Sequence, residues 1–214
     1  MDLATMRGQV RKDLHDEDAA NYRWTDAVLE RHISRAVEEY SEAVPYQAYQ
    51  DITAVADQRA YSLVSYTYLK DRPNSIVRVC APWVSTAVWS EAKWRVWNNT
   101  LYLLDDTLPV VAGDIIRIFY GRRHILDATT STIPQEHEPL IALGAGAFAA
   151  LEWANYATSR INVGGGWTPK NYREWAEPRL VEFQVALVGL ELQRAMGEDG
   201  RVSPLQAWDS WKTI

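Results

Sequence analysis

Few residues of this chain have the types and spacing that chemistry requires, and the first of them is a histidine between two acids. His137 lies between Glu136 and Glu138, a composition that suggests a metal site. Neighbouring residues on a helix point about 100° apart, however, and the HExxH spacing of zinc hydrolases is absent. We therefore expect no metal ion at this position.

Glu152 is the second candidate, because it is an acid inside an otherwise apolar helical stretch. Pairs of carboxylates hydrolyse glycosidic bonds, so Glu152 raises the hypothesis of a cell-wall glycosidase. A single acid in an apolar stretch is more commonly the partner of a basic residue. The glycosidase is therefore the third of three functional hypotheses.

The remaining candidates have simpler structural interpretations. Gly164–Gly166 precede an expected helix start and could hold an anion, but the Lys-Ser/Thr ending of a phosphate loop is missing. Cys80 lies in an apolar run without a nearby base, which indicates a buried thiol and suits a reducing compartment. We expect His32 on the surface of its helix. The sequence thus predicts no catalytic residue, no cofactor and no metal.

Aromatic residues are unusually abundant, with ten Trp and eleven Tyr against three Phe. Rings on a β-sandwich commonly stack on sugars, which makes a carbohydrate- or receptor-binding module the second functional hypothesis. Trp94 and Trp97 are three residues apart, so a regular strand would direct them to opposite sides. Packing in a core or between subunits is the preferred interpretation of the four central tryptophans, Trp83, Trp89, Trp94 and Trp97.

Composition limits the class of protein that could position these residues. The chain has 214 residues, is 47% hydrophobic, and carries 22 Lys and Arg against 28 Asp and Glu, a net charge of −6. This charge argues against a surface that wraps nucleic acid through many phosphate contacts. No basic segment leads into an apolar one at the start, and no apolar run approaches about 20 residues, so we expect neither a secretion signal nor a membrane span.

The best-defined element is a helix that begins after Thr25. Thr25 is placed to cap it, and Trp24 can pack on Leu29 as a hydrophobic staple. Leu29, Ile33, Ala36, Val37 and Tyr40 then follow the spacing of one apolar helical face. Further helices are predicted over 2–14, over the Ala- and Gly-rich 135–160, and from Pro169 to about Met196. The last of these has one apolar face, made of Tyr172, Trp175, Ala176, Leu180, Phe183, Leu187 and Leu190.

Residues 47–121 show the alternation of strands instead. Residues 48–55 and 59–63 are predicted to form a β-hairpin, and Asn98–Asn99 to turn between two further strands. The predicted fold is α+β, a four-helix bundle with an inserted antiparallel β-sandwich or barrel module and an extended C-terminal tail. The predicted domains are 1–46 with 122–197 for the bundle, 47–121 for the β module and 198–214 for the tail.

The order of several segments resembles the head–tail adaptor (connector) proteins of tailed bacteriophages. The resemblance covers roughly residues 2–195, and no single motif carries it. The segments are Tyr22–Leu29, Ile33–Ser41, Asp57–Leu63, Ala112–Gly121 and Ser131–Pro134.

The resemblance implies a structural virion protein without enzymatic activity. Such proteins form a ring, generally of twelve copies, that docks on the portal, extends the DNA channel and provides the platform for tail or nozzle proteins. DNA would pass through without sequence-specific binding. The protein would be made in the host cytoplasm and located at the head–tail junction of the virion.

Three sets of residues are the predicted contacts of such a ring. The tail, 198–214, supplies the portal-binding candidates Val202, Leu205, Trp208, Trp211 and Ile214. The polar side of the helix after Thr25 supplies the subunit-interface candidates Glu30, Arg31, Arg35, Glu38 and Glu39. The tail-facing candidates are Trp83, Trp89, Trp94 and Trp97.

Overall fold

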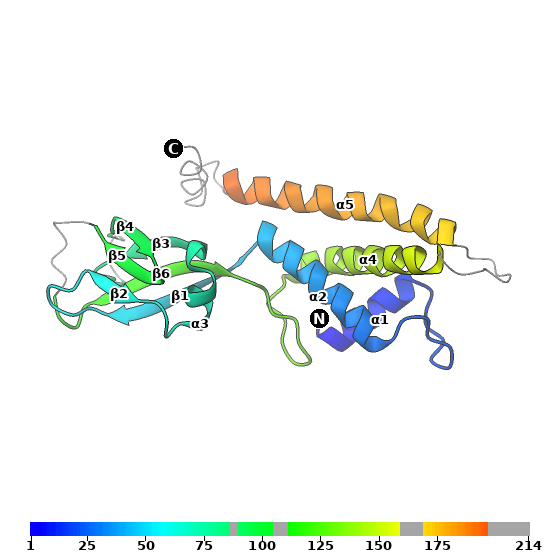
Figure 1. The fold of residues 1–214 in the computed structure, drawn as a ribbon, viewed down its shortest axis with the longest axis horizontal. Helices are drawn as coiled ribbons and strands as arrows, with labels where there is room; N and C mark the ends of the chain where they lie inside the picture. The colour runs from blue at the N-terminus through cyan, green and yellow to red at the C-terminus, as the bar shows by residue number, and fades with distance from the viewer. Residues whose placement is uncertain (86–89, 105–110, 159–168, 197–214) are drawn as a thin grey trace. The chain divides into compact units, whose positions relative to one another are not determined.

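The chain forms two compact units, each with its own core. The computed structural model describes residues 1–85, 90–104, 111–158 and 169–196. Residues 1–45 and 123–194 form a helical unit, and residues 46–122 form a β unit (Figure 1). The chain therefore passes between units at Pro45/Tyr46 and again at Arg122/Arg123, close to the ends of the predicted β module.

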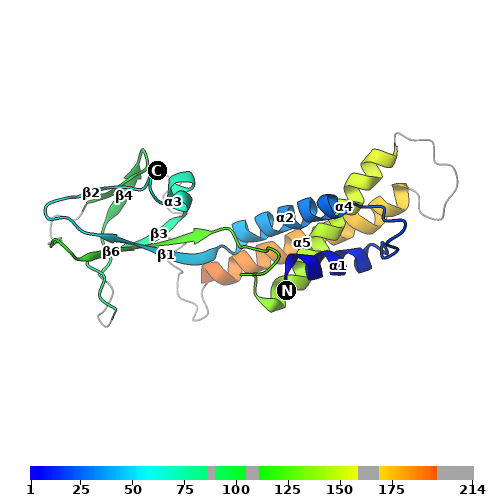
Figure 2. The same ribbon diagram turned by 90° about the horizontal axis from the view of Figure 1, so that it is seen from below.

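The helical unit contains four α-helices and a short 3-10 turn among its described residues (Figures 1 and 2). Their bounds are α1 Leu3–Asp13, α2 Asp26–Ala43, η2 Gln135–His137, α4 Glu138–Thr158 and α5 Pro169–Met196. Asp2 caps α1 by accepting a hydrogen bond from the Thr5 amide at 2.7 Å. Thr25 caps α2 as predicted, although its bond from the Val28 amide is long, at 3.4 Å.

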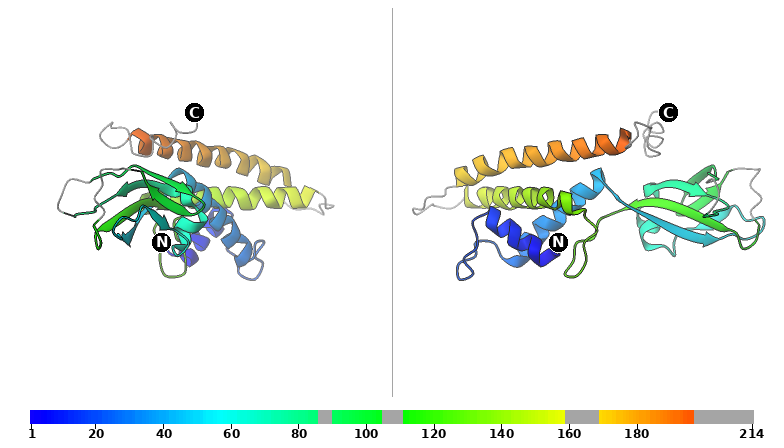
Figure 3. Two further views of the ribbon diagram at one scale, coloured as in Figure 1. Left: turned by 60° about the vertical axis from the view of Figure 1, so that its left-hand side comes forward. Right: turned by 180° about the vertical axis from the view of Figure 1, so that it is seen from behind.

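Helix α4 lies at the centre of this unit, with α1 and α2 packed directly against it. Its small side chains, among them Ala145, Ala149 and Ala154, are fully buried. Helix α5 lies along α4 (Figure 3), and the rings of Phe148 and Phe183 meet edge to face with centroids 5.9 Å apart. Within the described residues, every helix is too short or too polar to cross a lipid bilayer.

The helix that begins after Thr25 packs in this core with the apolar face that its spacing predicted. Its apolar face is buried, with Leu29, Ala36 and Tyr40 fully inaccessible to solvent. Trp24 is buried in the same cluster, and its indole N–H donates to the carbonyl of Ala149 at 3.3 Å. The capped start of α2 is therefore tied to α4 by a hydrogen bond as well as by apolar packing.

The β unit consists of two small antiparallel sheets and a short helix. One sheet has the strand order β1-β6-β3 and the other β2-β5-β4. The bounds are β1 Tyr46–Thr53, β2 Ala60–Ser62, α3 Thr67–Asp71, η1 Pro73–Ser75, β3 Ile76–Cys80, β4 Trp94–Trp97, β5 Thr100–Leu103 and β6 Ile115–Arg122. Both sheets contribute to one apolar core that includes Ile52, Leu63, Leu101, Ile116 and Ile118.

The predicted architecture, a four-helix bundle with a β-sandwich or barrel, is wrong, although the fold is a mixed α+β one. The described residues contain five α-helices, and the strands form two three-stranded sheets. The helix that the prediction lacked is α3, which spans only Thr67–Asp71 and lies between β2 and β3 in the chain. A helix of this length is too short to show a helical period in the sequence.

The predicted hairpin of 48–55 with 59–63 is also wrong. Strand β1 pairs along its whole length with β6, from Tyr46 opposite Arg122 to Thr53 opposite Ile115, whereas β2 pairs with β5. Alternation shows which face of a strand is buried but does not show which strand lies beside it. The turn at Asn98–Asn99 is confirmed: both residues have positive φ, and they join the antiparallel strands β4 and β5.

Candidate functional site

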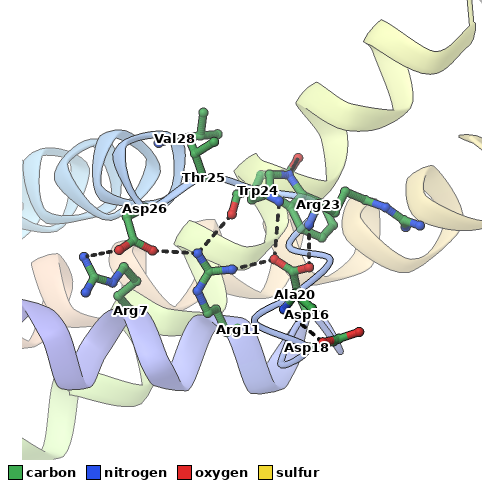
Figure 4. A network of polar contacts seen from close by, with 11 residues as sticks. Arg7, Arg11, Asp16, Asp18, Ala20, Arg23, Trp24, Thr25, Asp26 and Val28 are labelled. Atoms are coloured by element: carbon green, nitrogen blue, oxygen red, sulfur yellow. Dashed lines mark hydrogen bonds and ion pairs between the residues drawn. The ribbon is translucent and has the colours of Figure 1, made fainter.

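Arg11 joins α1 to the start of α2 through a network of charged groups (Figure 4). Its guanidinium donates to Asp16 at 2.6 Å, to Asp26 at 2.7 Å and to the carbonyl of Trp24 at 2.9 Å. Asp16 also accepts from the backbone amide of Arg23 at 2.7 Å. The hydrogen bond from Arg11 is the main cause that lowers the pKa of Asp26. These charges hold two helices together, which is a structural role.

Glu152, the glycosidase candidate, is half-exposed and engaged in ion pairs with α2. Both of its carboxylate oxygens accept from Arg31 at 2.6 Å, and the Nε2 atom of His32 lies 3.3 Å from one of them. The prediction that His32 lies on the surface is wrong, because the residue is only 4% exposed. Its burial lowers its pKa. The helical period places His32 next to the apolar face, and contact with α4 completes its burial.

His137 and His124 have hydrogen-bonding partners within the fold. The Nδ1 atom of His137 lies 2.6 Å from the hydroxyl of Tyr40, whose pKa is raised by burial to about 12. His124 lies between two carbonyl oxygens, with Nδ1 2.9 Å from Thr132 and Nε2 2.9 Å from Val44. Burial also raises the pKa of the Cys80 thiol. Across the described residues, no three His, Cys, Asp or Glu side chains gather closely enough to hold a metal ion.

The predicted subunit-interface residues lie along α2, and their charges have partners within the chain. Arg31 pairs with Glu152, and Arg35 pairs with Glu39 at 3.1 Å while its guanidinium lies over the Phe148 ring. Glu30 accepts from Arg7 of α1, and Glu38 lies 4.0 Å from Arg123. Arg31 and Arg35 still have side chains that are 60% exposed. The surface is available to a partner, and binding there would compete with these pairs.

The predicted tail-facing tryptophans do not form one platform. Trp94 is half-buried and packs on the core of the β unit, whereas Trp97 is 68% exposed on the other side of β4, as the spacing predicted. Trp83 is half-buried and meets Phe119 edge to face, with centroids 5.6 Å apart. Trp89 lies outside the described residues.

A second aromatic feature, which the sequence did not reveal, surrounds Arg117 on the β1-β6-β3 sheet. The guanidinium of Arg117 lies over the rings of Tyr49 and Trp83, 4.0 and 4.4 Å from their centroids. It also donates two hydrogen bonds of 2.7 Å to Asp51. Asp51 and Arg117 are cross-strand neighbours in the β1–β6 register. Only that long-range pairing brings these residues together, so local sequence patterns could not have shown the cluster.

A third surface feature that sequence reasoning missed is an apolar row on α5, on the side away from α4. We call it the outer stripe: Val181, Val185, Val188 and Leu192 are 57%, 65%, 55% and 57% exposed. The opposite side of α5 is the predicted apolar face, where Phe183 and Leu187 are buried. The sequence contains the outer stripe as a second apolar series, in which successive members are 4, 3 and 4 residues apart. It was overlooked because one apolar face already accounted for the helix.

The portal-binding candidates, Val202, Leu205, Trp208, Trp211 and Ile214, lie outside the described residues, as do Gly164–Gly166. A scan of the chain against protein-family models gives no match, and a search of curated proteins finds no similar protein. The function must therefore be inferred from the sequence resemblance and from the surfaces of the two units.

Proposed function

We propose that this protein is a structural head–tail adaptor of a tailed bacteriophage. In this proposal, copies of the chain form a ring that docks on the portal, extends the DNA channel and provides the platform for tail or nozzle proteins. The observation that carries the proposal is the outer stripe of α5. A helix that is apolar on two opposite sides needs a partner on each, and α4 covers only one of them.

The environment of the ionisable residues supports a structural role. The ionisable groups considered above form bonds within the helical unit. Glu152 bonds to Arg31, His137 to Tyr40, and Arg11 to Asp16. The net charge of −6 supports the DNA-channel part of the proposal, because a negative protein attracts phosphate weakly and lets DNA slide.

The deciding experiment mixes the purified protein with the portal protein of the same phage and images the product by electron microscopy. We expect a ring of the protein on one end of the portal. A protein that stays monomeric alone and also forms no ring with the portal would refute the adaptor function. Monomeric protein without portal is compatible with it, because assembly can depend on the partner.

A deletion of residues 198–214 tests the predicted portal anchor separately. We expect the shortened chain to retain its helical circular dichroism and its cooperative unfolding but to lose portal binding. Unchanged portal binding would show that the anchor lies elsewhere in the chain.

The alternative function, a carbohydrate- or receptor-binding module, is favoured by one observation, the 68% exposure of Trp97 beside the β4–β5 turn. A glycan array with Trp97→Ala compared against Trp94→Ala tests it. Glycan binding that is lost in Trp97→Ala and retained in Trp94→Ala would replace the adaptor proposal, since Trp97 is the one of these two residues that presents an open ring face. No glycan binding by the unaltered chain would remove the alternative.

A further inference from the structure

We propose that the free protein pairs with a second copy of itself through the outer stripe, with the two α5 helices antiparallel. This inference does not rest on the adaptor function. A two-fold contact closes after two copies, so it cannot build a ring. In an adaptor, the pair would separate before the subunits join the portal.

The spacing of the outer stripe is that of a coiled-coil seam. Steps of 4, 3 and 4 residues from Val181 to Leu192 are the a and d positions of a heptad pattern, and they extend over ~16 Å of helix. Side chains at these positions pack between those of a facing helix. Because all four are more than half exposed, the seam is unoccupied by the residues that the structure describes.

The charges beside the seam disfavour a parallel pair. In a parallel coiled coil, a g residue lies beside the e residue five positions later in the partner helix. This rule places Glu177 beside Glu182 of the second copy, and the same contact occurs twice. Two pairs of like charges would flank a seam of only four residues.

The antiparallel arrangement removes this repulsion. Val181 then faces Leu192 of the second copy, and Val185 faces Val188. Along the two flanks, the Gln184 amide can donate to the Glu191 carboxylate of the second copy, and Glu182 lies beside Gly189. Among the residues that the structure describes, no two like charges meet on these flanks, and the small Gly189, which has no neighbouring atom within 4 Å of an added Cβ, permits close approach.

The size of the contact predicts a weak dimer. A single pair of helices over this length buries less than the ~1,600 Å² of a standard protein interface. We therefore expect a dimer whose population rises with concentration. A weak pair also shields the valines from unspecific contacts without preventing later assembly.

Sedimentation equilibrium of the full chain over a range of concentrations provides the first test, with Val185→Glu as the disrupting variant. Val185 is 65% exposed, so the monomer should fold unchanged, while a buried carboxylate in the seam should raise the dimer dissociation constant at least about tenfold. Gln193→Glu adds the same charge to the same helix outside the seam and should leave dimerisation essentially unchanged. A protein that is monomeric at every concentration, or a dimer indifferent to Val185→Glu, would overturn the proposal.

Cysteine crosslinking provides the second test, because it reports the direction of the helices. In the antiparallel pair, residue 181 faces residue 192 of the second copy and lies ~16 Å along the axis from its own counterpart, beyond disulfide reach. The double variant Val181→Cys with Leu192→Cys should therefore form crosslinked dimers, and Val181→Cys alone should not. Crosslinking of Val181→Cys alone would indicate a parallel pair and contradict the proposal. A free protein that forms a ring of more than two copies, and loses it in Val185→Glu, would contradict the proposal as well.

Discussion

At the scale of single residues, the packing of α5 on α4 depends on a close contact between Phe183 and Gly144. Phe183 of α5 is fully buried against α4 beside Gly144. A Cβ atom added to Gly144 would lie 2.8 Å from two carbons of the Phe183 ring. Gly144 therefore serves to admit this ring, and the chain accepts the lower helix propensity of glycine at that position.

Replacing Gly144 with alanine should consequently destabilise the protein. The ring of Phe183 or the α5 backbone must shift, which we expect to lower the free energy of unfolding by ~1–3 kcal/mol. The matched control is Gly8→Ala in α1, where an added Cβ meets no atom within 4 Å and the free energy should rise by up to ~1 kcal/mol. Urea denaturation measures both, and a Gly144→Ala chain as stable as Gly8→Ala would show that the contact is unimportant.

A second residue with a measurable consequence is Asp127, in the loop after β6. The backbone amides of Thr129 and Thr130 donate to its carboxylate at 2.8 and 2.7 Å, and they are the main cause that lowers its pKa from 3.8 to about 2. Because the folded pKa lies below the unfolded one, the unfolded chain binds a proton first as the pH falls. This contribution to stability is complete above about pH 4 and is lost as the pH falls to about 2.

Carboxyl carbon NMR titration should therefore give an Asp127 midpoint near 2. In Asp127→Asn, unfolding should lose part of its dependence on pH between 4 and 2, since that residue no longer titrates. An Asp127 midpoint close to the ordinary 3.8 would show that the turn does not hold the carboxylate in solution.

At the scale of elements, α5 is distinguished by exposed apolar residues on a second side and by a proline beyond its first turn. Pro178 lies inside the helix, where it removes one backbone hydrogen-bond donor and its ring crowds the carbonyl four residues earlier. Arg179 donates from its side chain to the Trp175 carbonyl at 3.0 Å, and its guanidinium lies 4.0 Å from the Trp175 ring centroid. The arginine side chain thus packs across the turn that contains the proline.

Replacing Pro178 with alanine should stabilise α5. The added N–H can complete the helical ladder, and we expect the free energy of unfolding to rise by up to ~3 kcal/mol. Thermal unfolding followed by circular dichroism measures the change, with the exposed Gln184→Ala as a control on the same helix. A lower melting temperature for Pro178→Ala would mean that the proline itself favours the packing of α5 on α4.

At the scale of the whole molecule, the two units have separate apolar cores. The β unit is an insertion whose two ends are paired, because Tyr46 lies opposite Arg122 at one end of the β1–β6 ladder. The chain can leave and re-enter the helical unit through neighbouring strands. The β unit contains all of its own strand partners among the described residues.

We therefore expect residues 46–122, expressed alone, to fold. Dispersed amide NMR signals and a cooperative thermal transition would demonstrate this. Ile118 is fully buried in the β core, so the same segment carrying Ile118→Asp should show neither property. If the unaltered segment behaves like the Ile118→Asp control, the β unit depends on the helical unit for its stability.

The sequence by itself determined the features that depend on neighbouring residues. The apolar face from Leu29 to Tyr40, the cap at Thr25 and the turn at Asn98–Asn99 could be predicted because helix periods, caps and tight turns involve residues a few positions apart. The buried face of α5 through Phe183 followed from the same rule.

Only the tertiary structure decided the features that depend on residues far apart in the chain. The β1–β6 pairing, the burial of His32 and the fit of Phe183 against Gly144 join segments separated by dozens of residues. The outer stripe belongs to both groups: its spacing is visible in the sequence, but its exposure is not. A period shows that a face is apolar, whereas only the packed structure shows whether another element already covers it.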